Sequence, residues 1–208
     1  MPKAFSDQEK KQIEAGLLEQ GMKLFSQYGL KKTSIEELAA AVGISKAAFY
    51  LFYESKEALF MDVVEQAEQQ YRQVMLAMID QPGETPRARL TAVFKQAFSL
   101  WKTIPVLQVF TRGEYGRIAQ RLPEEKVREH MRSDRDFLDQ LVAHCRSAGI
   151  PIVIPAEEMS GLMYALFFAV LHEDDLGPSS LTASLQVMLE LAAAYCLGEI
   201  EVSPQRTK

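Results

Sequence analysis

The sequence of 208 residues has little of what marks secreted or membrane-spanning proteins. Its two cysteines, Cys145 and Cys196, are too few for a disulfide framework and fit a reducing compartment. No apolar run reaches the roughly 20 residues that a bilayer span needs, and the N-terminal segment has no apolar core of a secretion signal. We therefore expect a cytoplasmic protein.

The sequence also lacks the short motifs of the common enzyme classes. It contains no glycine-rich phosphate loop, no nucleophile elbow and no HExxH zinc motif. Its three histidines, His130, His144 and His172, include no pair at the i, i+4 spacing of a helical metal site. We therefore expect no metal, no cofactor and no catalytic residue. A helical enzyme that uses one of these histidines or Glu114 remains an alternative, which a turnover screen would expose.

A basic excess, the simplest sign of a nucleic-acid partner, is missing as well. The net charge is −5, but residues 1–60 contain eight lysines and eight acidic residues, so the whole negative excess lies in the remainder. A DNA-binding face needs basic residues where the phosphates lie, not a basic whole protein. The charge therefore neither supports nor excludes DNA as a partner.

Helical periodicity is present along the chain, whereas convincing strand patterns are absent. Beyond the first sixty residues, Ser55 is expected to cap a long helix that ends before the break DQPGETP at residues 80–86. The proline-bounded segment GIPIVIP reads as an extended loop. Later helices are expected near residues 87–104, 105–121, 124–148, 156–173 and 180–197. The prediction is an all-α fold of about nine helices, with a small unit at 1–54, a connecting helix at 55–80 and a bundle at 81–208.

Three shorter helical patterns fill the first fifty-four residues. The first has one apolar face and is expected to end at Gly29; that face consists of Ile13, Leu17, Gly21, Leu24 and Tyr28. Ser34 and Glu37 form the capping-box pattern of a second helix, which Gly43 ends. Ser45 caps a third helix. Two short capped helices joined by a turn with a glycine are typical of a helix-turn-helix.

In a helix-turn-helix the second helix lies in the major groove of DNA, with its N-terminal residues at the base edges. We expect Phe49 to pack inward with Phe52 and Tyr53, because they share a helix face, while Lys46 and Tyr50 point outward. Hydroxyl and ammonium groups at the helix starts suit phosphate, and small alanines allow close approach. The predicted DNA-binding residues are Thr33, Ser34, Ser45, Lys46, Ala47, Ala48, Tyr50, Leu51 and Lys56.

The stretch from Thr33 to Leu59 resembles the N-terminal domain of TetR-family transcriptional regulators. The resemblance rests on Ser34, on LAAAVGIS at 38–45, on Tyr50 and on SKEAL at 55–59. Two departures are Ala47, where the family often has glycine, and Ala48, where threonine is common. The resemblance implies a homodimeric regulator, expected to be a repressor that a small hydrophobic ligand releases from a palindromic operator. A ligand-binding sensor that never contacts DNA is the other alternative.

The same resemblance implies that the bundle binds the ligand and dimerises. Segments 156–173 and 180–197 are apolar on nearly all sides, so we expect these last two helices to form the dimer interface. Two central helices of a monomeric bundle would give the same pattern. Ligand sites are mostly apolar, and the large side chains of the bundle are the candidates. They are Phe94, Phe98, Trp101, Phe110, Tyr115, Met131, Phe137, Tyr164 and Phe168.

Overall fold

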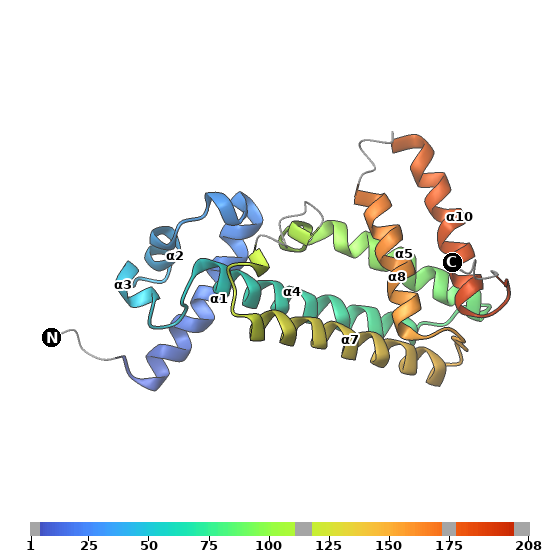
Figure 1. Ribbon diagram of the computed structural model, residues 1–208, viewed down its shortest axis with the longest axis horizontal. Helices are drawn as coiled ribbons and strands as arrows, with labels where there is room; N and C mark the ends of the chain where they lie inside the picture. The colour runs from blue at the N-terminus through green and yellow to red at the C-terminus, as the bar shows by residue number, and fades with distance from the viewer. Residues whose placement is uncertain (1–4, 111–117, 172–177, 202–208) are drawn as a thin grey trace, which may run out of the picture. The chain divides into compact units, whose positions relative to one another are not determined.

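The computed structural model describes residues 5–110, 118–171 and 178–201. Within these ranges the chain forms α-helices and one 3-10 helix and no strand, so the predicted all-α fold is confirmed (Figure 1). The elements are α1 (Asp7–Lys32), α2 (Ile35–Ala41), α3 (Lys46–Phe49), α4 (Lys56–Ile79), α5 (Pro86–Thr103), η1 (Pro105–Phe110), α7 (Glu124–Ser147), α8 (Ala156–Leu171) and α10 (Pro178–Cys196). None of the described helices combines the length and apolar character that crossing a membrane requires.

The described residues form two compact units. The first consists of Met1–Gln70 and Thr103–Val127, and the second of Tyr71–Lys102 and Arg128–Lys208. These units do not follow the divisions expected at residues 54 and 80. The reason is that α4 contributes to two cores: its first part packs in the first unit, whereas Met75 and Ile79 lie in the core of the second. The division into a DNA-binding domain, a connecting helix and a ligand-binding domain concerns function, so compact units do not test it and it stays a prediction.

The first unit is built on the packing of α1 against α4. Leu17 and Phe25 are buried on α1, and the ring of Phe25 meets that of Phe60 edge to face, with the centroids 5.1 Å apart. Between them lies Gly21, where an added Cβ would stand 3.0 Å from a methyl carbon of Val63. A glycine is needed here because the two helices approach so closely.

One residue of the face predicted for α1 is misplaced. Tyr28 is half exposed, and Phe25 takes the buried position instead. The α1 helix is interrupted at Gly29, whose φ of 74° lies in the region that favours glycine, and Leu30 provides the next buried side chain. The predicted end of the first helix at Gly29 is therefore confirmed, but the apolar face stops one turn earlier than expected.

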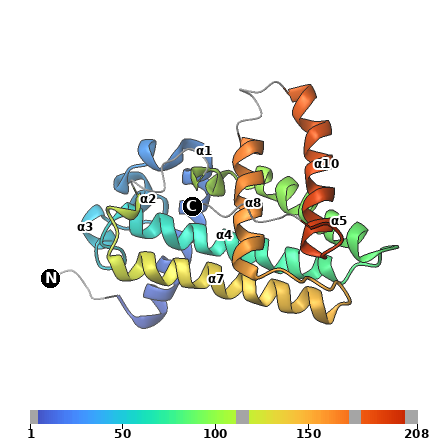
Figure 2. The same cartoon turned by 45° about the vertical axis from the view of Figure 1, so that its right-hand side comes forward.

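The second unit has its core between α5, α8, α10 and the later parts of α4 and α7. Helices α8 and α10 pack side by side (Figures 1 and 2). Arg89 of α5 donates to the carbonyl oxygens of Ile79 and Ala148, at 2.7 Å each, and so closes the ends of α4 and α7. Charged side chains that bind terminal carbonyls in this way satisfy groups that a helix leaves unpaired.

The loop predicted at residues 149–155 is confirmed. Ile150, Ile152 and Ile154 are buried, while Val153 between them is exposed. The alternation is that of a strand, but the segment forms no ladder; the Val153 amide donates to the carbonyl of Cys196, at 2.9 Å. The helix predicted at 105–121 is described only at its two ends, as η1 and as helical residues 118–119.

Candidate nucleic-acid interface

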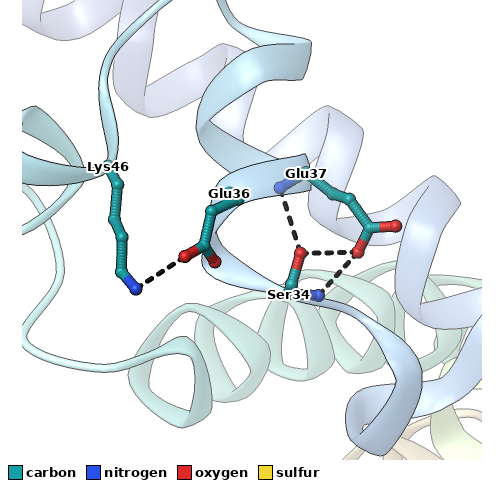
Figure 3. Close-up of polar contacts among 4 residues, drawn as sticks. All are labelled: Ser34, Glu36, Glu37 and Lys46. Atoms are coloured by element: carbon teal, nitrogen blue, oxygen red, sulfur yellow. Dashed lines mark hydrogen bonds and ion pairs between the residues drawn. The ribbon is translucent and has the colours of Figure 1, made fainter.

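Helices α2 and α3 are joined by a tight turn whose caps are those that the sequence predicts. The Ser34 hydroxyl accepts from the amide of Glu37 at 3.2 Å, and the Glu37 carboxylate accepts from the amide of Ser34 at 2.8 Å (Figure 3). Gly43 has a φ of 73°, which ends α2. Ser45 then caps α3 by accepting from the amide of Ala48, at 3.1 Å. The predicted helix-turn-helix is confirmed as a structural unit.

The α3 helix is one turn long and depends on a single anchor. Phe49 is fully buried, and its ring lies 6.0 Å from that of Tyr53. On the other side, Lys46 and Ala47 are exposed, and Tyr50 and Leu51 are 49% and 74% exposed. The predicted division into an inward and an outward face is thus confirmed for Phe49, Lys46 and Tyr50.

An ion pair connects the two helices of the motif on this outward face. The Lys46 ammonium donates to the Glu36 carboxylate at 2.6 Å, although the residues are ten positions apart (Figure 3). Both side chains are more than half exposed. The hydrogen bond lowers the pKa of Glu36 and raises the pKa of Lys46, so each stabilises the charge of the other. The sequence carries no local signal for this pair, because its members lie on separate helices.

Three predicted phosphate donors form hydrogen bonds within the chain. Thr33 is buried, and its hydroxyl donates to the carbonyl of Gly29 at 2.9 Å. The Ser34 hydroxyl donates to the Glu37 carboxylate at 2.7 Å. The pKa of Glu37 is lowered first by the hydrogen bond from the Ser34 amide and then by this one. The Lys56 ammonium donates to the carbonyls of Leu30 and Thr33, at 2.8 Å each. Thr33 therefore has no part in the DNA contact set that we propose, because its hydroxyl faces inward.

The predicted ligand residues separate into distinct groups. Phe98 and Trp101 contact Phe167 in the second unit, and their ring centroids lie 4.0 Å and 5.3 Å from that of Phe167. The ring of Tyr71 meets that of Trp101 edge to face. Phe94 is buried in the same core. The sequence analysis missed the two partners, Tyr71 and Phe167. The sequence offers no signal for Phe167, because α8 is apolar on nearly all sides; only the structure shows that it lies on the inward face of α8 with Met159, Met163 and Leu166.

The other candidates differ from this group in their exposure or in their neighbours. Tyr164, Phe168 and Met131 are 63%, 64% and 61% exposed, which does not fit the buried lining of a ligand site. Phe137 packs against the same core as Phe94, and the guanidinium of Arg72, which pairs with Asp134, lies 5.1 Å from the centroid of the Phe137 ring. Phe110 belongs to η1 in the first unit, and Tyr115 lies outside the described residues.

Comparison with known proteins finds a family model that matches the region of the helix-turn-helix. Residues 17–63 match the model of bacterial regulatory proteins of the tetR family. An uncharacterized HTH-type transcriptional regulator, YuxN of Bacillus subtilis, is 35% identical over 95 residues, which are 45% of this chain and 31% of YuxN. The chain thus spans less than a third of the length of the curated relatives that it matches.

Solved structures share the fold over almost the whole chain. A transcriptional regulator of the TetR/AcrR family from Thermobifida fusca has a TM-score of 0.61 at 17% identity, over 86% of this chain and 96% of that chain. The transcriptional regulator FadR from Bacillus subtilis, solved in complex with stearoyl-CoA, has a TM-score of 0.56 at 16% identity, over 92% and 99% of the two chains. At these identities the likeness establishes the fold.

Proposed function

Since its residues 17–63 belong to the tetR family of bacterial regulatory proteins, we propose that this chain is a transcriptional regulator that binds double-stranded DNA through α3. The observation that carries the proposal is the outward face of α3, where Lys46, Ala47, Tyr50 and Leu51 are exposed while Phe49 fixes the helix from within. A lysine and a tyrosine hydroxyl suit phosphate, and a small alanine beside them allows the helix to enter a groove.

Selection from a random pool of duplexes tests this function. The purified protein should enrich a palindromic sequence, since a two-fold protein binds paired half-sites. Tyr50→Phe, which removes a single hydroxyl from an exposed ring, should weaken binding to the enriched duplex by about tenfold. Tyr28→Phe is the control, because Tyr28 is equally exposed but lies at the end of α1. Failure to enrich any sequence would favour a sensor that does not contact DNA.

We further propose a homodimer through α8 and α10. Besides Tyr164 and Phe168 on α8, the exposed side chains on α10 include Val187, Met188 and Leu191. Apolar side chains gathered on two neighbouring helices mark an interaction surface. Phe168→Glu should therefore shift the sedimentation coefficient from that of a dimer to that of a monomer, whereas Val153→Glu, at an equally exposed position outside both helices, should not. A monomeric wild-type protein would contradict the proposal.

The effector that we propose is a small hydrophobic molecule bound in the second unit. The aromatic cluster of Phe98, Trp101 and Phe167 supports this proposal, as does the stearoyl-CoA complex of FadR. Because Trp101 is the only tryptophan of the chain, its fluorescence reports on the cluster directly. A screen of hydrophobic acids and their thioesters should find a compound that both changes this fluorescence and weakens duplex binding. Release of DNA without a change in fluorescence would place the ligand elsewhere.

A further inference from the structure

The ion pair with Glu36 occupies the Lys46 ammonium, which is expected to contact DNA phosphate. The lysine belongs to the outward face of α3, yet its ammonium already binds a carboxylate at 2.6 Å. A carboxylate oxygen and a phosphate oxygen are the same kind of acceptor for an ammonium group. DNA that approaches α3 therefore meets a lysine whose charge is balanced by Glu36, and a negative carboxylate beside it.

We propose that Glu36 competes with DNA phosphate for Lys46, and that this competition sets how tightly the chain binds duplexes of any sequence. The inference rests on the proposed function. The pair is suited to this role because it is exposed: the two side chains are 53% and 60% accessible, so water and phosphate can both displace the carboxylate. An exposed pair of this kind is weak and can open, unlike a buried one.

The capping of α2 depends on the neighbouring residue, Glu37, and not on Glu36. Glu37, not Glu36, closes the capping box with Ser34, and its carboxylate accepts from both the amide and the hydroxyl of that serine (Figure 3). The Ser45 cap of α3 also forms without Glu36. The change Glu36→Gln keeps the length of the side chain and its exposed position, so it removes the charge and leaves the fold of α2 and α3 in place.

The experiment measures binding of a labelled mixed-sequence duplex by fluorescence anisotropy over a series of salt concentrations. Glu36→Gln should bind about two- to fivefold more tightly than wild type, the range that an exposed ion pair supports. In the wild type, Lys46 must leave the Glu36 carboxylate when it binds a phosphate, whereas in Glu36→Gln its charge is already available. The slope of the logarithm of the association constant against the logarithm of the salt concentration should therefore become steeper by up to about 0.9. In a Lys46→Ala background the same change should have a smaller effect, since no lysine remains to be released.

Glu19→Gln is the matched control. Glu19 forms an equally exposed pair with Lys23 on α1, at 2.8 Å, and its substitution changes the net charge by the same amount. Circular dichroism of both variants is the check that they are folded. Equal affinity of Glu36→Gln and Glu19→Gln, weaker binding of Glu36→Gln, or an undiminished gain in the Lys46→Ala background would each overturn the inference. A wild-type protein that binds no duplex at all would instead refute the proposed function.

Discussion

Replacing Lys56 by methionine removes an ammonium group but keeps the length of the side chain. In the structure this group donates to the carbonyl oxygens of Leu30 and Thr33, at 2.8 Å each, and so ties the start of α4 to the connection between α1 and α2. Lys56 is half-buried, so water can reach the carbonyls only in part after the change. The loss of both hydrogen bonds should therefore lower the free energy of unfolding.

The size of the loss follows from the number of bonds. A hydrogen bond from a charged donor contributes about 1.5–3 kcal/mol, and partial access of water favours the lower end, so two bonds give about 3 kcal/mol. For a protein of this length that corresponds to a decrease in Tm of roughly 6–12 °C. Urea unfolding followed by circular dichroism should show a lower midpoint with an unchanged slope.

Lys23→Met is the control for this substitution. Lys23 also donates at 2.8 Å, but to an exposed carboxylate on the same helix, so its loss should leave the midpoint unchanged within error. Superimposable unfolding curves of the two variants would refute the reasoning. Duplex titration of the same proteins separates the two roles of Lys56: a phosphate contact would reduce the salt slope by about 0.9, whereas a purely structural lysine would not change it.

Two further predictions concern buried groups. Thr33→Val should lower the free energy of unfolding by about 1 kcal/mol, because the bond to Gly29 is lost, and leave duplex affinity unchanged; a loss of affinity at unchanged stability would restore Thr33 to the interface. Burial raises the pKa of Cys145 to about 11 and that of Cys196 to about 12, from 9.0, so native thiols should resist alkylation at about pH 8 until urea unfolds the protein. Because these thiols ionise at a lower pH in the unfolded protein than in the native one, their contribution to the free energy of unfolding is complete below pH 9.0. It declines as the pH rises toward 11 and 12, and urea midpoints measured across that range would show the decline. Rapid alkylation of the native protein would contradict the burial.

The features predicted correctly from the sequence depend on residues close together in the chain. Ser34 caps α2 through Glu37, three positions on, and Ser45 caps α3 in the same way. Gly43 takes the positive φ that the turn requires. Such signals are local, because a cap or a turn involves only a few consecutive residues. They suffice to identify the helix-turn-helix and the all-α fold.

Contacts between separate elements could not be predicted in this way. The acceptors of Lys56 lie 26 and 23 residues away, and the partner of Lys46 lies on the preceding helix. On α8, Phe167 and Phe168 are adjacent, but only Phe167 faces the core. A helix that is apolar on nearly every side has no periodicity by which to tell its inner face from its outer one. For this reason the sequence could not separate the exposed Phe168 from the inward Phe167.

The α3 helix has four residues, and one of them, Phe49, carries its attachment to the protein. Ala47 and Leu51 are exposed, so new side chains there disturb little of the packing, whereas the ring of Tyr50 meets that of Phe49 edge to face, with the centroids 5.8 Å apart. Under the proposed function, paralogous copies of such a gene could diverge in target sequence by substitutions at Ala47 and Leu51, without compensating changes in the interior.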